Sequence, residues 1–462
     1  MAEWCAENLR DVQGWNASGL PMTSTCNEAA KLLDGAIRQV VSMRDCDKLG
    51  GMMKTFENLA KFSKENAMVT AFLTGMDALG TKKSILSDEN FRKSVKEADK
   101  FSEAKTINDR ERMHLKAAVL FASGDMPGAE AMWESILSSY PNDLIAIKFV
   151  HDSYFFSGSA EGKRDSIARI LPRLSPNEPF ILGMYAFGLE ECAEYAKAEE
   201  IAHKAISIRK EDPWAIHAIA HVMEMQGRRK ESLEFLGKMK PHWEPARFVA
   251  CHIHWHMAAV YIEEGDYRTA LRIYDREVYP RAKVSDSWLD NADAISMLWR
   301  LELQGMDVGD RWKILCKKDE HLHDHALSFN DVHIGMCLKR AGFLKEEREL
   351  HKSMVKYVNS GKDTSTHRVA RDVGLPLYEG MIAFADEDYE KAIERVMSVR
   401  KGIFKISGSH AQNDIFTQTL ILACINSGKA EHIQLAKRIL SERDLVKPNS
   451  GISDRIALRL RG

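Results

Sequence analysis

Small and apolar residues recur along this chain with a period of about 34 residues. The recurring signature is a turn glycine or another small residue, two or three polar residues, and then an alanine-like position. A helix-turn-helix unit of about this length is typical of tetratricopeptide arrays, in which each helix pair buries its apolar side against the next pair. The first four turn positions follow one another after 34, 35 and 34 residues, at Gly124, Gly158, Ala193 and Gly227.

The signature continues towards the C-terminus with longer gaps of 37 to 45 residues, and an earlier example lies near Gly80. A small residue lets two antiparallel helices approach, and glycine also accepts a left-handed turn between them. Alternating runs that would indicate strands are almost absent. We predict an all-α solenoid of tetratricopeptide-like helix-turn-helix repeats, with nine or ten helix pairs. The later turn positions are Gly265, Gly305, Gly342, Glu387 and Gly428.

The length of the chain fits this architecture. A single hydrophobic core stops growing near about 250–300 residues, whereas a solenoid of 462 residues needs only contacts between neighbouring repeats. We predict an N-terminal helical cap over residues 1–100, a repeat array over 101–440, and a C-terminal capping segment over 441–462.

Composition and charge narrow the class of partner. The chain is 45% hydrophobic and 29% charged, with a net charge of -2, which favours neither nucleic acid nor an anionic membrane as the main partner. No apolar run reaches the roughly 20 residues that span a bilayer, and no secretory signal is evident. The 8 cysteines form no Cys-x-x-Cys pair, as expected of reduced thiols. We therefore predict a cytoplasmic protein with no membrane and no nucleic-acid partner.

Histidines concentrate in one part of the array. Eleven of the 17 histidines fall between His203 and His333. Within one predicted helix, His217, His221 and Glu224 stand at i, i+4 and i+7 and so share a face. The run 252–256 places its first and last histidines together, with His254 on another face.

Polar residues also stand at similar distances before the turn position in successive first helices. His217 precedes its turn position by ten residues, His256 by nine, Asp293 by twelve and His333 by nine. First helices of such arrays stand side by side, roughly 10 Å apart, so these residues are expected to converge on the concave groove. The candidate ligand-binding residues are His217, His221, Glu224, His254, His256, Asp293, Arg300, Asn330, Asp331, His333, His410 and Gln412.

Three interpretations of this polar set remain open. The favoured one is a cavity that binds a small molecule or peptide end, in which Arg300 would hold a carboxylate or phosphate between tryptophan walls. The second is a hydrogen-bond network that only ties repeats together, since buried polar groups must find partners. The third is a metal at His217, His221 and Glu224, completed by His256 or His333. No spacing demonstrates a full ligand set, so no metal is assigned and the cofactor is left open.

An ordered set of motifs over nearly the whole chain resembles the family of tetratricopeptide repeat protein thirty-eight. This resemblance implies an α-helical repeat fold and a cytosolic protein, and it supplies no catalytic residues. Modules that clamp acidic peptide tails carry lysines, arginines and asparagines in the groove, whereas histidines, aromatics and acids stand here, which speaks against that role. The motifs are Gly19-Leu20-Pro21, Asn27-Glu28-Ala29, His217-Ala218, His221 to Arg228, His254-Trp255-His256, Asp293-Ala294, Leu298-Trp299-Arg300, Phe329 to His333, Gly374-Leu375-Pro376 and Gly408 to Gln412.

The sequence thus favours a helical repeat protein whose concave groove binds a peptide, protein or small-molecule ligand through a histidine-rich polar site. The alternative is an enzyme, possibly metal-dependent, that acts on a small molecule in the same groove. Fold alone does not separate the two, because function depends on the site rather than on the scaffold.

Overall fold

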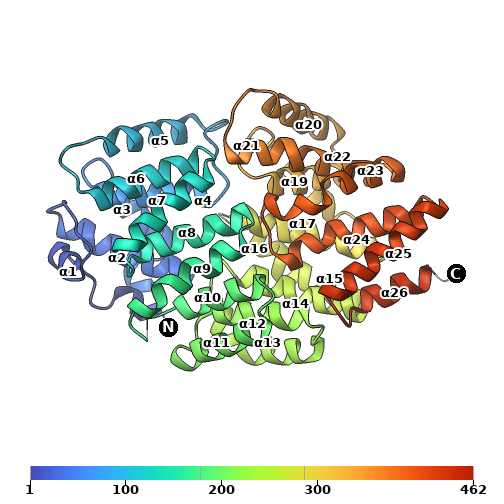
Figure 1. The fold of residues 1–462 in the computed structure, drawn as a ribbon, viewed down its shortest axis with the longest axis horizontal. Coiled ribbons are helices and arrows are strands. Elements are labelled where there is room, and N and C mark those ends of the chain that lie inside the picture. Colours follow the sequence, from blue (N-terminus) through green and yellow to red (C-terminus); the bar gives the residue numbers. More distant parts are fainter. Residues whose placement is uncertain (1, 177, 286, 461–462) are drawn as a thin grey trace. The chain divides into compact units, whose positions relative to one another are not determined.

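Every regular element that the structure describes is a helix (Figure 1). The structure is a computed structural model and describes residues 2–176, 178–285 and 287–460. The chain divides into unit 1 (Met1–Ala218 and Pro241–Ala250) and unit 2 (Ile219–Lys240 and Cys251–Gly462). Across the described ranges, no helix combines the length and the apolar character needed to cross a membrane. The predicted cap limits at residues 100 and 440 stay a prediction.

The helices have the following bounds. Unit 1 contains η1 (Ala2–Ala6), α1 (Val12–Ala17), α2 (Asn27–Ser42), η2 (Asp47–Leu49), α3 (Met52–Ala60), α4 (Ala67–Leu79), α5 (Glu89–Ser102), α6 (Asp109–Ala122), α7 (Met126–Ser139), α8 (Leu144–Ser157), α9 (Ala160–Ile170), η3 (Leu171–Arg173), α10 (Ile181–Glu191) and α11 (Tyr195–Ile208). The division between the units falls within α12 (Pro213–Met225), α13 (Arg229–Trp243) and α14 (Ala250–Glu264).

Unit 2 continues from α14 to the C-terminal helix. Its elements are α15 (Tyr267–Ile273), the π-helix η4 (Tyr274–Val278), α16 (Tyr279–Val284), α17 (Trp288–Leu303), α18 (Arg311–Leu315), α19 (Ser328–Ala341), α20 (Leu344–Val358), α21 (Ser365–Val369), the π-helix η5 (Ala370–Gly374), α22 (Leu375–Ala385), α23 (Tyr389–Val399), η6 (Arg400–Ile406), α24 (His410–Asn426), α25 (Ala430–Val446) and α26 (Gly451–Arg459).

The predicted turn positions are confirmed residue by residue. Each of the nine from Gly124 to Gly428 follows the end of a helix and has a positive φ, for example +67° at Gly227 and +80° at Gly342. Ala193 and Glu387 adopt the same conformation without being glycine, with φ values of +59° and +61°. Near Gly80 the left-handed residue is Thr81, at φ +55°. The all-α repeat architecture is therefore confirmed.

The longer repeats of unit 2 have a structural cause. The helix that follows Gly265 continues beyond α15 through the π-helix η4 into α16, so that it is longer than a standard second helix. After Gly305 the second helix is reduced to the short α18, and a longer connection leads to α19. These changes stretch the period of about 34 residues without altering the turn that follows each first helix.

Unit 1 is stabilised by aromatic packing and by a buried ion pair. The ring of Trp133 stacks on that of Phe149, with centroids 5.5 Å apart. Asp143 caps α8 and accepts hydrogen bonds from Arg110 Nε at 2.7 Å and His114 Nε2 at 2.9 Å. Burial alone would raise the pKa of Asp143, but the charges of Arg110 and His114 outweigh it and hold this pKa well below its usual range.

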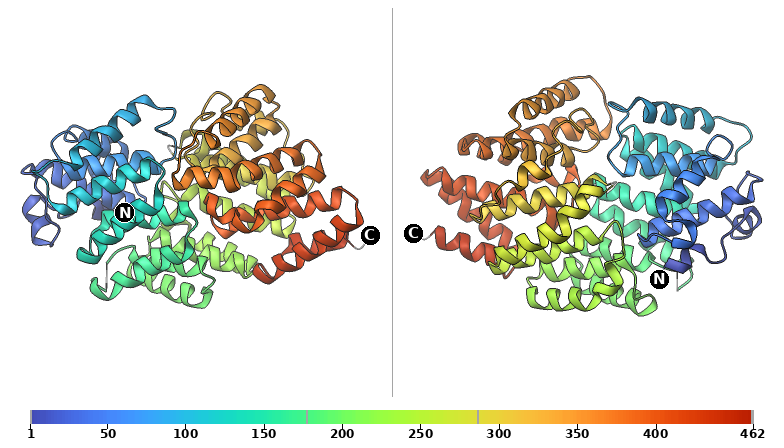
Figure 2. Two further views of the ribbon diagram at one scale, coloured as in Figure 1. Left: turned by 45° about the horizontal axis from the view of Figure 1, so that its top comes forward. Right: turned by 180° about the vertical axis from the view of Figure 1, so that it is seen from behind.

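In unit 2, first helices close on one another instead of lining an open face. Helix α17 contacts both α19 and α24, and α22 also contacts both. Trp299 Nε1 on α17 donates to Thr419 Oγ1 on α24 at 3.0 Å. Figure 2 shows the red C-terminal helices beside the green-yellow helices α14 and α15 in both views. Polar residues on the inner side of these first helices are buried as a result.

Candidate functional site

Helices α12 and α14 bring three histidines of unit 2 together. Within α12, His221 and Glu224 are one turn apart, and within α14, His252 and His256 are one turn apart, so each pair lies on one face. Ring nitrogens of His221, His252 and His256 lie within 4.8 Å of one another. We call these three residues, with the carboxylates of Glu224 and Asp293, the histidine centre.

The geometry of His252 and His256 fixes the proton on each ring. Nδ1 of His252 lies 2.7 Å from Asp293 Oδ2, and Nδ1 of His256 lies 2.7 Å from Glu224 Oε2. A carboxylate only accepts hydrogen bonds, so each Nδ1 carries a proton. The two Nε2 atoms then face each other at 3.1 Å. In two neutral rings both would present lone pairs, so the contact is satisfied either by a proton on one Nε2 or by another electron-pair acceptor between them.

Burial and neighbouring charges move the pKa values of this centre apart. Burial by itself would lower the pKa of His252, but Asp293 outweighs it and raises that pKa. Burial and the adjacent His252 lower the pKa of His256. Burial would raise the pKa of Glu224, but Lys447 and His256 hold it well below its usual range. The pKa values of the two facing imidazoles are therefore shifted in opposite directions.

Beyond Glu224, a chain of buried ion pairs leads to the C-terminal segment. Lys447 Nζ lies 2.8 Å from Glu224 Oε1 and 3.3 Å from Glu263 Oε1. Glu263 also accepts from Ser450 Oγ at 2.8 Å. Arg443 makes a bidentate contact with Asp414, both oxygens at 2.8 Å. We call these five charged residues the ion-pair network: Glu224, Glu263, Asp414, Arg443 and Lys447.

Several predicted residues meet in the histidine centre or touch it. His221, Glu224, His256 and Asp293 belong to it, and Gln412 Nε2 donates to Asp293 Oδ1 at 2.9 Å. Arg300 Nη2 donates to the carbonyl oxygens of Ala411 and Gln412 at 2.7 and 3.1 Å. These hydrogen bonds direct the guanidinium to the backbone of α24 and not into a groove. The guanidinium of this buried arginine also lies over the Trp255 ring, 5.2 Å from its centroid.

The other predicted residues lie on α12, α14, α19 and α24. His217 lies one turn before His221 on α12, and its ring packs on that of Phe187, with centroids 5.0 Å apart. On the other side of α14, His254 Nε2 lies 3.4 Å from a Glu277 carboxylate oxygen. Asp331 pairs with His325 at 3.2 Å. Asn330 is buried, His410 is exposed at the first turn of α24, and His333 donates from Nδ1 to the Phe329 carbonyl oxygen at 2.7 Å.

The candidate set omitted five residues of the histidine centre and the ion-pair network: His252, Glu263, Asp414, Arg443 and Lys447. A signal for His252 was present, because the spacing of His252 and His256 puts them on one helix face. Glu263, Arg443 and Lys447 gave no local signal. Lys447 meets Glu224 across 223 positions and Ser450 meets Glu263 across 187, distances over which no periodicity argument reaches.

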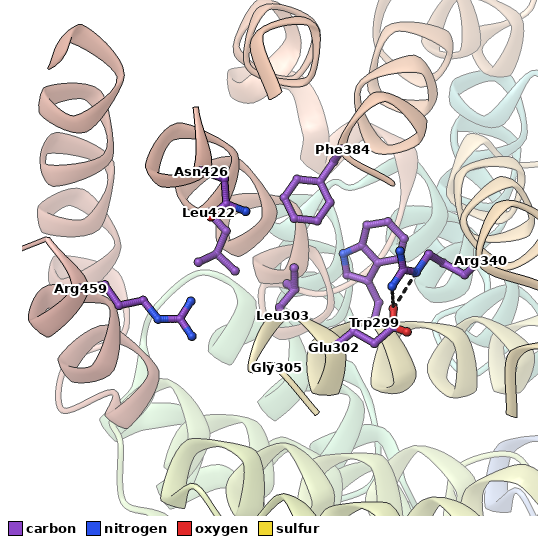
Figure 3. A pocket seen from close by; sticks show the side chains of 9 residues that line it. All are labelled: Trp299, Glu302, Leu303, Gly305, Arg340, Phe384, Leu422, Asn426 and Arg459. Atoms are coloured by element: carbon purple, nitrogen blue, oxygen red, sulfur yellow. Dashed lines mark hydrogen bonds and ion pairs between the residues drawn. The ribbon is translucent and has the colours of Figure 1, made fainter. Parts of the chain in front are cut away.

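A separate pocket of about 210 Å³ lies at the ends of several unit 2 helices (Figure 3). Trp299 forms part of its apolar wall, and Arg340 is paired with Glu302 at 2.7 Å. Arg459 reaches towards it from α26. Pockets for drug-sized ligands usually occupy about 300–1,000 Å³, so this one is small. The lining residues are Trp299, Glu302, Leu303, Gly305, Arg340, Phe384, Leu422, Asn426 and Arg459.

No protein-family model matches the chain. Among solved structures, the APC/C hetero-tetramer Cut9–Hcn1 is similar over 100% of this chain and 76% of that one, with 12% identity and a TM-score of 0.44. The human IFIT1 dimer with PPP-AAAA is similar over 100% and 99%, with 12% identity and a TM-score of 0.38. Naa15/Naa10 bound to HypK-THB is similar over 93% and 80%, with 13% identity and a TM-score of 0.29.

These similarities concern the helical fold, and no role is carried over from them. Fold and site together define the class: an all-α helical repeat protein of the tetratricopeptide type, with a buried histidine centre in unit 2.

Proposed function

We propose that this protein is a ligand-binding helical repeat protein that holds its ligand at the histidine centre. The observation that carries the proposal is the 3.1 Å approach of Nε2 of His252 to Nε2 of His256, with both Nδ1 atoms occupied by carboxylates. This arrangement brings two electron pairs to one point when the proton shared between the rings leaves, and a ligand that accepts both pairs would stabilise it.

The cost of the buried charges supports a functional reading over a purely structural one. Each ion taken out of water loses several kcal/mol of solvation, and apolar side chains of similar volume often stabilise a fold as well or better. Both carboxylates beside the histidines are at most 6% exposed. Ionisable groups with displaced pKa values cluster at functional sites, which favours a ligand here.

The finer parts of the proposal rest on the sequence. Membership of the tetratricopeptide repeat protein thirty-eight family and a cytoplasmic location follow from the motif resemblance and are proposed here. A peptide, protein or small molecule is proposed as the ligand, and a partner other than nucleic acid is proposed from the charge balance alone. An enzyme acting on a small molecule would use the same centre, since displaced pKa values also suit acid–base catalysis.

The test is native mass spectrometry of the full chain as purified, compared with the same sample after denaturation. We expect the native mass to exceed the chain mass by a bound species. His256→Gln is expected to lose that species, and His254→Gln, two positions away on the same helix, is expected to keep it. A native mass equal to that of the bare chain, together with thermal shifts in a ligand screen that are the same for wild type and His256→Gln, would contradict the proposal.

A further inference from the structure

We infer that His221, His252 and His256 form a binding site for a divalent transition-metal ion of the zinc class. The inference rests on the proposed function and names the chemistry of its ligand. Imidazole nitrogen suits zinc, cobalt, nickel, copper and iron, whereas calcium and magnesium prefer oxygen donors. Three nitrogen donors from two helices therefore select the first group.

The spacing of the donor atoms fits such an ion. Zinc–nitrogen bonds measure about 2.0–2.1 Å, so two ligands at a tetrahedral angle stand about 3.3 Å apart. The two facing Nε2 atoms of His252 and His256 are 3.1 Å apart. The third ring, that of His221, has its centroid 4.4 Å from the His256 ring and 6.1 Å from the His252 ring. An ion bound between these rings would therefore require only small movements of the three side chains.

The groups behind the histidines are those that metal sites use. A ligating histidine usually donates its other N–H to a carboxylate or a carbonyl oxygen, which fixes the tautomer and the orientation of the ring. His252 has Asp293 in this role and His256 has Glu224. Both carboxylates are themselves held, Glu224 by Lys447 and Asp293 by Gln412. These hydrogen bonds therefore orient both Nε2 atoms towards the site before an ion binds.

The burial of the three histidines indicates where an ion would enter. The His252 side chain is 14% exposed, while His221 and His256 are buried. Entry is therefore expected at the His252 edge of the centre.

The test is a Co²⁺ titration of the full chain after treatment with a chelator, followed by displacement with Zn²⁺. We expect one Co²⁺ per chain with the intense visible absorption of a four-coordinate ion, lost when Zn²⁺ is added. His252→Gln and His256→Gln are each expected to weaken binding at least 100-fold. His254→Gln is the matched control, because His254 lies on the same helix and pairs with Glu277, and its affinity should stay unchanged.

A variant outside the ligand set keeps the test informative if a histidine variant does not fold. Asp293→Asn retains the shape of the side chain that orients His252, and loss of such a carboxylate lowers metal affinity about 10–100-fold. Circular dichroism reports whether each variant is folded. A folded wild-type chain that binds no stoichiometric Co²⁺ or Zn²⁺, or binds them equally well as His256→Gln, would overturn the inference. If the native mass shows an organic species that depends on His256 and the titration shows no Co²⁺ binding, the metal site is refuted and the proposed function remains supported.

Discussion

Lys447 Nζ lies 2.8 Å from Glu224 Oε1, although the two residues are 223 positions apart along the chain. The contact joins the segment after α25 to the last turn of α12, and both side chains are buried. It holds the carboxylate that orients His256. The C-terminal segment of unit 2 is thus part of the support of the histidine centre.

Replacing Lys447 should therefore destabilise the fold. Lys447→Met leaves Glu224 buried without its cation, and breaking a buried pair in this way costs about 3–5 kcal/mol. We expect the thermal unfolding temperature to fall by on the order of 10 °C. Lys437→Met is the control, because Lys437 is exposed on the preceding helix α25 and its replacement should cost less than about 0.5 kcal/mol. Equal melting temperatures for the two variants would refute this account.

His333 should make the protein sensitive to mild acid. Burial lowers its pKa to about 4, and in the part of the chain that the structure describes its Nε2 has no hydrogen-bond partner. The unfolded chain takes up this proton near pH 6.5 and the native state only near pH 4, so the unfolded state binds more protons in between. Stability is fully present above pH 6.5 and is lost as the pH falls, by about 3 kcal/mol in total.

The measurement is the urea midpoint at pH 7.0 and at pH 4.5, for wild type and for His333→Gln. The glutamine variant does not titrate there, so the change between the two pH values should shrink. His410→Gln serves as the matched variant, because His410 is exposed. The interpretation fails if His333→Gln keeps the full pH dependence of the wild type.

Two turn glycines should respond differently to the same substitution. A Cβ at Gly227, where φ is +67°, would lie 2.5 Å from the Pro448 carbonyl oxygen. A Cβ at Gly342, where φ is +80°, has no atom within 4 Å among those described. Both alanine variants meet the left-handed penalty of roughly 1–2 kcal/mol, but only Gly227→Ala also crowds the backbone. We expect Gly227→Ala to be at least about 1 kcal/mol less stable by chemical denaturation than Gly342→Ala. A reversed order would contradict the close packing of residue 448 on this turn.

Arg110 should set the acid resistance of unit 1. The depressed pKa of Asp143 means that its stabilisation is present above about pH 4 and is lost as the pH falls through the folded-state value. Arg110→Met removes the stronger partner of a buried carboxylate, so acid unfolding followed by circular dichroism should begin at higher pH. Lys96→Met removes an exposed positive charge and should leave the acid transition unchanged. An unshifted transition for Arg110→Met would show that His114 suffices.

Much of the fold could be predicted because its signals are local. A left-handed turn between two helices depends on a few consecutive residues, and all nine turn positions from Gly124 to Gly428 adopt it. Two helix faces of the histidine centre were also within reach, since the pairing of His221 with Glu224, and of His252 with His256, follows from the helical period. The role of Lys447 was not, because no local pattern links it to Glu224.

The sequence by itself determined the helical repeats, their turns and the pairs of polar residues that share a helix face. Only the tertiary structure decided which faces meet. Contact of α17 with α24 brings Gln412 to Asp293 across 119 positions, and the return of the C-terminal segment brings Lys447 to Glu224. The physical reason is that a turn is governed by sterics within a few residues, whereas the closing of first helices on one another depends on the summed packing of many distant side chains.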